Sequence, residues 1–233
     1  MLQASSGQRV NTDSCVFADQ IVPPCNPSRI LDIGTGSGVV AMMLGIRFPE
    51  STIEAIEPIQ EIFEVAAINF ASQKIFKNIN PQQKKVQEMS QKSHGQFDLV
   101  VCNPPYFQNS TESSDPLRHI ARHTLALGPS DLFSGFADLT TDSGSAWMSC
   151  PTNDLDDWLR AGKAVSLLPY SLTHLHSHPG AKPHVTIIGW SKTDTNPLNE
   201  KDIFYRHSKG GSQSEWMTGF RARWYPSRYF KSN

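Results

Sequence analysis

Residues 29–38 of the chain read RILDIGTGSG, an apolar run that passes directly into a glycine-rich turn. The run from Arg29 to Ile33 is short and dominated by isoleucine and leucine, which is typical of a buried strand. Val39 to Phe48 then shows the apolar pattern of a helix, which Pro49 ends. A strand, a glycine-rich turn and a helix in this order form the start of a nucleotide-binding α/β unit. The stretch therefore predicts an α/β fold with a largely parallel sheet.

Three glycines, Gly34, Gly36 and Gly38, shape the turn. A ligand can approach the backbone closely at a glycine, and the N-terminus of the following helix offers free N–H groups. The fingerprint of dinucleotide-binding proteins would place its third glycine at position 39, which is Val39. The spacing G-x-G-x-G, with Asp32 before it, instead favours the adenosyl donor S-adenosylmethionine over a pyrophosphate cofactor.

A second predicted strand runs from Thr52 to Ile56 and leads into Glu57, 19 residues after Gly38. A carboxylate in this position can accept hydrogen bonds from both hydroxyls of a ribose, as it does in dinucleotide-binding folds. The alternative is a solvated glutamate before a turn. Residues 60–73 follow with the pattern of an amphipathic helix.

The segment 74–96 has a weaker pattern than the rest of the domain. We expect a third strand near Lys84 to Val86. A polar side chain after that strand, Gln87 or Glu88, is then in a position to bind the adenine amino group of the donor.

A fourth predicted strand, Phe97 to Cys102, is followed by Asn103-Pro104-Pro105-Tyr106. Two prolines end a strand abruptly because neither can donate to a sheet ladder, and the resulting loop lies at the edge where open α/β sheets bind ligands. The Asn103 side-chain carbonyl and the Pro104 backbone carbonyl can accept hydrogen bonds from one amino group, and Tyr106 can stack on a flat ring. The loop therefore suits methylation of a planar amine or amide nitrogen, although such a stretch is also an ordinary turn.

The second half of the chain continues the alternation of helices and strands. We expect helices over 129–139 and 154–162 and a strand over 146–150. Two further apolar runs, 165–175 and 185–190, are expected to close the sheet as an antiparallel pair.

Histidines occur in two groups with the spacing of metal ligands. His119 and His123 are four residues apart, but no glutamate of an H-E-x-x-H motif lies between them. His174, His176 and His178 alternate along a predicted strand, which is more typical of a solvated strand edge. We therefore expect no metal site.

The segment 201–233 carries seven basic and two acidic residues, a clear excess of positive charge in a protein whose net charge is -1. Six of its aromatic residues are interleaved with these charges: Trp216, Phe220, Trp224, Tyr225, Tyr229 and Phe230. This mixture suits the phosphates and unstacked bases of a nucleic acid, and it equally suits a helix that packs on the domain. Arg122 and His123, beyond the Asn103 loop, are a second candidate for such contacts, with a neutral surface helix as the alternative.

The composition bounds the class of protein. With 233 residues, of which 38% are hydrophobic and 18% charged, the chain suits one folded α/β domain. No apolar run approaches the roughly 20 residues of a membrane helix, and four widely spaced cysteines indicate neither a zinc site nor a disulfide framework. We expect a cytoplasmic protein, monomeric by default, with a leader or lid over residues 1–28 and a single domain over 29–233.

The glycine turn, Glu57 and Asn103-Pro104-Pro105-Tyr106 together resemble the class I S-adenosylmethionine-dependent N-methyltransferases. Residues 10–14 (VNTDS), 103–107 (NPPYF) and 121–124 (ARHT) make the chain similar to the bacterial tRNA1(Val) adenine-N6-methyltransferases, which methylate the adenine beside the anticodon. The resemblance implies a Rossmann-like methyltransferase fold. In that fold a mostly parallel, seven-stranded sheet has helices on both faces and an antiparallel strand at its end.

The resemblance also implies roles for individual residues. The donor would be bound by Asp32, Gly34, Thr35, Gly36, Gly38, Glu57 and Asn103. The reacting amine would be held by Asn103, Pro104, Pro105 and Tyr106. The tRNA would be contacted by Tyr106, Phe107, Arg122 and His123. Two other functions stay open: methylation of a glutamine amide in a release factor, which uses the same N-P-P-Y stretch, and non-catalytic binding of nucleic acid.

Overall fold

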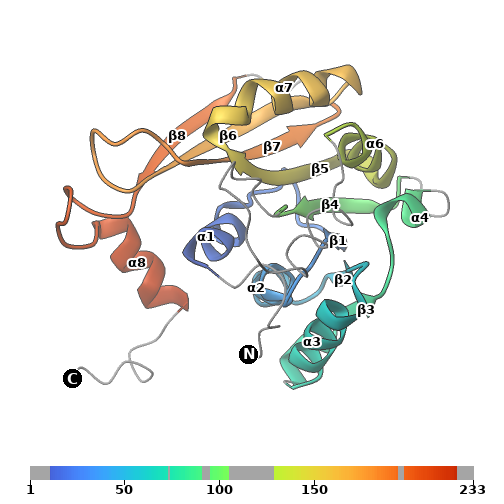
Figure 1. The fold of residues 1–233 in the computed structure, drawn as a ribbon. Helices are drawn as coiled ribbons and strands as arrows, with labels where there is room; N and C mark the ends of the chain where they lie inside the picture. The colour runs from blue at the N-terminus through green and yellow to red at the C-terminus, as the bar shows by residue number, and fades with distance from the viewer. Residues whose placement is uncertain (1–10, 73, 91–94, 105–128, 194–196, 225–233) are drawn as a thin grey trace.

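The computed structural model describes residues 11–72, 74–90, 95–104, 129–193 and 197–224. An eight-stranded sheet runs through this part of the chain (Figure 1). From edge to edge its strands are β3 (Ile79–Gln82), β2 (Thr52–Ile56), β1 (Arg29–Ile33), β4 (Phe97–Cys102), β5 (Thr140–Pro151), β7 (Val185–Ser191), β6 (Leu168–His176) and β8 (Asn199–Phe204). The helices are α1 (Thr12–Gln20), α2 (Val39–Arg47), α3 (Gln60–Ala71), α4 (Val86–Ser90), α6 (Pro129–Leu139), α7 (Leu155–Ala164) and α8 (Glu215–Trp224).

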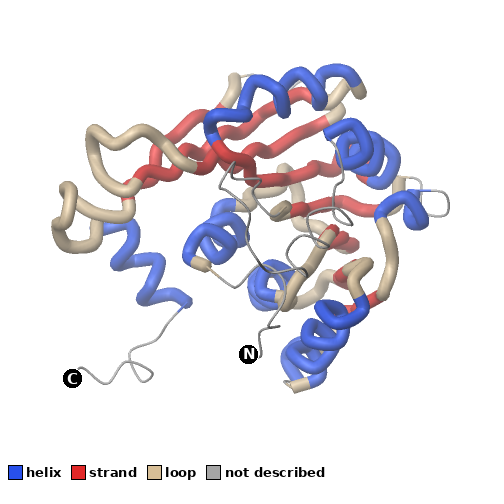
Figure 2. Tube along the Cα trace, viewed as in Figure 1, coloured by secondary structure: helices blue, strands red, loops and turns tan. Residues whose placement is uncertain are grey.

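Helices cover both faces of the sheet (Figure 2). Successive strand residues point to opposite faces, so neighbouring Ile30 and Leu31 of β1 belong to two different hydrophobic clusters. One cluster includes side chains of α1, α2, α3 and α8, and the other includes side chains of α4, α6 and α7. The prediction of an α/β sheet with two covered faces is confirmed.

The strand order changes direction at β1. β1 pairs in parallel with β2 on one side and with β4 on the other, while β3 and β5 extend the parallel arrangement outward. The crevice beyond the carboxyl ends of such a pair is the topological switch point, where open α/β sheets bind ligands. β7 is antiparallel to both of its neighbours, β5 and β6, as the two apolar runs of the sequence predicted.

The third strand was predicted in the wrong place. β3 covers Ile79–Gln82, whereas Val86 begins α4 and is buried in the cluster that includes α6. β3 contains Pro81, and a proline is tolerated because this strand is at the edge of the sheet. The apolar Val86 therefore marks a buried helix face and not a strand.

The sheet has one strand more than the seven predicted. β8 lies in the basic C-terminal segment and pairs in parallel with β6, so β6 is not a solvated edge. Two of its histidines make cross-strand hydrogen bonds instead: His174 Nε2 lies 2.9 Å from Glu200 Oε1, and His176 Nε2 lies 2.7 Å from Asp202 Oδ1. The prediction of a solvated strand edge for these two histidines was wrong because it overlooked β8.

The first helix, α1, has Asn11 as its N-cap, whose side chain accepts a hydrogen bond from the backbone N–H of Ser14. Residues 15–18 of this helix are buried against α2 in the same cluster as the central strands. The predicted division of the chain at residue 28 and the role of the first residues as a lid stay predictions. Within the described ranges no helix is long and apolar enough to cross a membrane.

Candidate active site

Three segments singled out in the sequence meet at one edge of the sheet. Ile33, at the end of β1, is in register with Ile56 at the end of β2 and with Cys102 at the end of β4. The residues that follow these three ends are the glycine turn, Glu57 and Asn103. The fold thus places the predicted donor site beside the predicted amine site.

Gly36 and Gly38 both have a positive φ, 60° and 89°, but their surroundings differ. A Cβ on Gly38 would lie 2.5 Å from Cε1 of Phe70 in α3, so that space is already filled. A Cβ on Gly36 would meet nothing nearer than the carbonyl oxygen of Gly34, at 4.0 Å. Gly38 therefore serves the packing of α3 on the turn, whereas Gly36 leaves space that a ligand can occupy.

The Asp32 carboxylate is buried and faces the inside of the turn. Its Oδ2 accepts a hydrogen bond of 2.6 Å from the Thr35 hydroxyl, and the backbone of Ala41 makes a further hydrogen bond to the carboxylate. Burial raises the pKa of Asp32 to about 6, although both hydrogen bonds oppose the rise. The hydrogen bonds indicate that Asp32 holds the shape of the turn.

The Glu57 carboxylate contacts the backbone of the same turn. Its Oε2 accepts the backbone N–H of Gly36 at 3.1 Å, and its Oε1 accepts the backbone N–H of Ile59 at 3.2 Å. Burial raises the pKa of Glu57 to about 7, and the nearby Asp32 carboxylate adds to the rise. A buried acid with such a pKa next to an open glycine is a common property of binding sites.

Asn103 is held by side chains from two distant parts of the chain. Its Nδ2 donates to the Ser14 hydroxyl in α1 at 2.9 Å, and its Oδ1 accepts from the Ser149 hydroxyl in β5 at 2.5 Å. The Ser14 hydroxyl in turn donates to Asn11 Oδ1 at 2.9 Å. The amide of Asn103 is therefore fixed between α1 and the sheet.

This chain of hydrogen bonds also fixes which way the amide points. A serine hydroxyl has one proton, and that of Ser14 goes to Asn11, so Ser14 can only accept from Asn103. The amide NH₂ of Asn103 must then face Ser14, and the carbonyl oxygen must face Ser149. A carbonyl oxygen has two lone pairs, so Oδ1 can accept a second hydrogen bond from a ligand while Ser149 holds it.

Several predicted site residues cannot be placed. Pro105, Tyr106, Phe107, Arg122 and His123 lie outside the described residues, as do His119, Tyr225, Tyr229 and Phe230 of the histidine and aromatic groups. Gln87 and Glu88, expected after the third strand, lie instead on the exposed side of α4. In the described ranges no group of three His, Cys, Asp or Glu residues could hold a metal ion.

Sequence reasoning missed three residues that position the site. Ser14 and Ser149 hold Asn103, and Nδ2 of the buried Asn69 donates to the carbonyl oxygen of Ser37 at 2.8 Å. Ser14 had a signal, since it follows the Thr12-Asp13 pair of the N-terminal motif. Asn69 is a polar residue on the apolar side of a predicted helix, which is also a signal, whereas a serine inside a buried strand such as Ser149 is not distinctive.

The strand order, the glycine turn at the switch point and the asparagine after β4 define a Rossmann-like methyltransferase fold. A predicted O-methyltransferase from Agrobacterium tumefaciens has this fold with a TM-score of 0.66 at 14% identity, over 89% of this chain and 94% of that chain. The chain belongs to the methyltransferase small domain family, whose model matches residues 5–127.

Curated relatives within this class share much of the chain. A tRNA1(Val) (adenine(37)-N6)-methyltransferase of Pedobacter heparinus is 26% identical over 208 residues, which cover 89% of this chain and 87% of the relative. A protein of the same name from Shewanella woodyi is 31% identical over 182 residues, covering 76% and 74%.

Proposed function

We propose that this methyltransferase transfers the methyl group of S-adenosylmethionine to the exocyclic N6 of an adenine in tRNA, at the position beside the anticodon. The observation that carries the proposal is the fixed amide of Asn103, next to the glycine turn and Glu57. The names of the relatives from Pedobacter heparinus and Shewanella woodyi support adenine in tRNA as the substrate. A tRNA substrate also accords with the cytoplasmic location expected from the sequence.

The residues of the turn fit an adenosyl donor. The space beside Gly36 leaves the backbone accessible, and Glu57 lies within a hydrogen bond of that glycine, where it can also accept from ribose hydroxyls. Asp32 and Thr35 support the turn from inside. The bound donor supplies an electrophilic methyl group, so the protein needs no nucleophilic side chain of its own.

The chain contributes to the reaction mainly by positioning the amine. The lone pair of an adenine amino group is delocalised into the ring, which makes the amine a poor nucleophile. The free lone pair of Asn103 Oδ1 and the backbone carbonyl oxygen of Pro104 would accept hydrogen bonds from the two N–H groups of the amine. These hydrogen bonds would favour a pyramidal nitrogen whose lone pair faces the donor methyl. Holding the reactants in this geometry accounts for most of the expected acceleration.

Contacts to the base and the RNA complete the proposal. Tyr106 would stack on a flipped adenine, with Pro105 keeping the loop rigid, and Phe107, Arg122 and His123 would contact the neighbouring RNA. After transfer, the extra proton of the amine would leave to water. Neither a metal ion nor a second subunit has a part in this mechanism.

The experiment compares substrates with a donor that carries a labelled methyl group. Unmodified tRNA and a bacterial release factor are incubated separately with the wild-type protein, and the label in each is counted. Label in tRNA and none in the release factor is the expected result. Label in the release factor alone would assign glutamine methylation, and donor binding without transfer to either would assign a binding module.

A further inference from the structure

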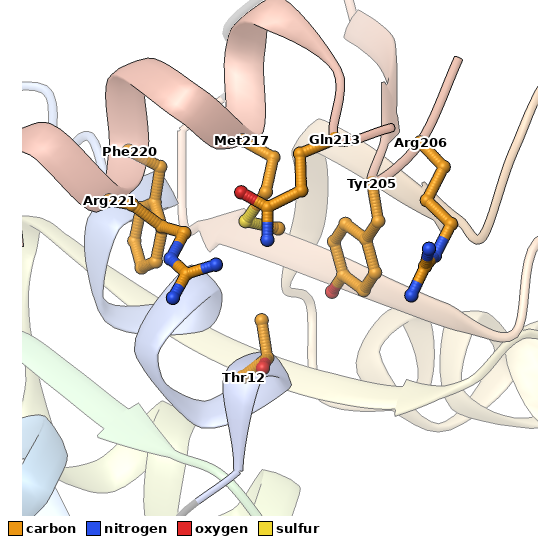
Figure 3. A pocket seen from close by; sticks show the side chains of 7 residues that line it. All are labelled: Thr12, Tyr205, Arg206, Gln213, Met217, Phe220 and Arg221. Atoms are coloured by element: carbon orange, nitrogen blue, oxygen red, sulfur yellow. The ribbon is translucent and has the colours of Figure 1, made fainter. Parts of the chain in front are cut away.

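A cavity of about 330 Å³ lies between the start of α1, the segment after β8 and α8 (Figure 3). Its lining residues are Thr12, Tyr205, Arg206, Gln213, Met217, Phe220 and Arg221. Figure 3 shows Arg221 and Arg206 on opposite sides of the space, with Tyr205 and Gln213 between them and Thr12 across from them. Its volume is within the range of pockets that hold small organic ligands.

The cavity has an apolar floor and a cationic rim. Phe220 and Met217 are 1% and 5% exposed, and both belong to the core cluster. Two guanidinium groups, an amide and a phenol complete the lining, and no acidic side chain is among the described lining residues. Arg206 donates one N–H to the carbonyl oxygen of Gly211 at 3.0 Å, which leaves further donors of its planar fork for a ligand.

The cavity lies at the same edge of the sheet as Asn103. β8 is parallel to β6, and both run in the direction of β4 and β5, so Tyr205 and Arg206 follow a carboxyl end as Asn103 does. Consecutive residues of α1 connect the two places. Ser14 accepts a hydrogen bond from Asn103, and Asp13 Oδ1 accepts one of 2.8 Å from the Tyr205 hydroxyl.

Asp13 is the acidic group of α1 that a bound anion would meet. Its carboxylate is engaged by the Tyr205 hydroxyl and lies 3.6 Å from His184 Nε2, and these two side chains lower its pKa although burial opposes them. The negative charge of Asp13 therefore lies against Tyr205 and His184, whereas the charged side chains that line the cavity are the two arginines.

We propose that this cavity binds one nucleotide of the RNA substrate, with its phosphate held between Arg206 and Arg221. The inference rests on the proposed function, which makes RNA the substrate. Guanidinium forks match phosphate oxygens in geometry and charge, and an aromatic ring over an apolar floor suits an unstacked base. Two arginines alone would also bind a peptide carboxylate, but the ring, the amide and the floor favour a nucleotide.

Single substitutions test the cavity better than truncation. Removal of residues from 212 onward would delete Met217 and Phe220 from the core and confound binding with folding. Arg206→Ala and Arg221→Ala remove the rim cations. Arg223→Ala is the matched control, because Arg223 is exposed on the same helix, does not line the cavity and pairs with Asp19 at 3.1 Å.

Affinity for an unmodified tRNA transcript is measured by fluorescence anisotropy at several salt concentrations, with donor affinity as a check on folding. Each rim variant should bind tRNA about 10-fold more weakly, as expected when a charge-assisted hydrogen bond is lost. The slope of log affinity against log salt should become shallower by about one for a lost phosphate contact. The control should stay within about 2-fold of the wild-type affinity.

Two outcomes would overturn the proposal. One is rim variants that bind tRNA as tightly as the control does with an unchanged salt slope. The other is that the rim substitutions weaken the binding of a labelled acidic peptide but leave the affinity for tRNA unchanged. Methylation of tRNA by the wild-type protein and its loss in Asn103→Ala are measured in parallel, so a failure of the cavity is distinguished from a failure of the proposed function. A wild-type protein that neither binds nor methylates tRNA would overturn both.

Discussion

The carboxylates in the two halves of the sheet differ in their exposure to solvent. At the ends of β1 and β2, Asp32 and Glu57 are each 1% exposed, and burial raises both pKa values. On β8, Glu200 and Asp202 have side chains more than half exposed, and each pairs with a histidine of β6. Acids whose pKa is raised by burial cost stability, whereas contacts made by half-exposed carboxylates contribute little in either direction. The carboxylates near the ends of β1 and β2 thus have the properties of a binding site. Those of β8 have the properties of contacts that attach an edge strand to the sheet.

Asn103 offers the sharpest test of the first half. Asn103→Ala removes an acceptor proposed to contact the reacting amine, so single-turnover methylation of tRNA should slow by about 10²-fold or more, by analogy with an oxyanion-hole donor. Donor affinity, measured by calorimetry, should fall far less than the rate, because the glycine turn and Glu57 are intact. A wild-type rate in the variant would show that the loop after β4 is only a turn.

Glu57 should make the stability of the donor-free protein depend on pH. Its pKa is raised in the folded state, so the folded protein binds the extra proton and the free energy of unfolding falls as pH rises from about 4.5 to about 7. The loss is on the order of 3 kcal/mol for a group buried in this way.

Urea unfolding at pH 5 and pH 8 measures this dependence. Glu57→Gln should show a smaller fall between the two values than the wild-type protein, whatever its absolute stability. Asp32, with a pKa raised to about 6, adds to the fall in both proteins. Equal falls in the two proteins would mean that Glu57 titrates near its ordinary pKa.

Two glycines of the turn are expected to have different roles, Gly38 in packing and Gly36 in donor binding. Gly38→Ala should destabilise the fold by roughly 2–4 kcal/mol, because the new Cβ meets Phe70 and the backbone φ is positive. Gly36→Val meets no neighbouring atom closely, so its cost in stability is limited to the strain of a positive φ, and the folded variant should bind the donor more than 10-fold more weakly. Thermal unfolding and donor titration of both variants check this contrast, and an unchanged donor affinity in Gly36→Val would place the donor elsewhere.

The serines that hold Asn103 should have a smaller effect than Asn103 itself. Ser14→Ala and Ser149→Ala each remove one hydrogen bond of the amide, so the single-turnover rate should fall about 3- to 10-fold while donor affinity is retained. The double variant should approach the rate of Asn103→Ala if orientation of the amide is what the serines provide. Rates that follow only the loss of thermal stability would reduce both serines to a packing role.

The contacts of Glu200 and Asp202 with the histidines of β6 should matter least. Glu200→Gln and Asp202→Asn should each change the free energy of unfolding by less than about 1 kcal/mol, because the carboxylates are half exposed. Methylation should stay at the wild-type rate. A large loss of activity in either variant would erase the distinction between the two halves of the sheet.

The central half of the fold could be predicted from local pattern because its strands are buried on both faces. Arg29–Ile33, Thr52–Ile56 and Phe97–Cys102 are short, mostly apolar runs, and the structure gives them these same bounds. The edge strands escaped prediction for the opposite reason. β3 contains Pro81, and β8 begins with four exposed residues, so their strand structure depends on a neighbour that the local sequence does not show.

The candidate site was predictable in its principal residues and not in their support. The glycine turn, Glu57 and Asn103 each follow a recognisable strand, and parallel pairing brings them together. The contacts of Ser14 and Ser149 with Asn103 join residues 89 and 46 positions apart, and only the fold shows them. The cavity at Arg206 likewise depends on α8, a helix that the basic and aromatic composition of the tail left ambiguous.

The most direct test of the central claim is to locate the transferred methyl group within the RNA. The wild-type protein is incubated with unmodified tRNA and a donor carrying a labelled methyl group, and the digested nucleosides are analysed by mass spectrometry. The account predicts the label in N6-methyladenosine, in the fragment that contains the adenine beside the anticodon, and its loss with Asn103→Ala. Label on a ring nitrogen, on a ribose or on another base would contradict the account, because Asn103 and Pro104 would then not be holding an exocyclic amine.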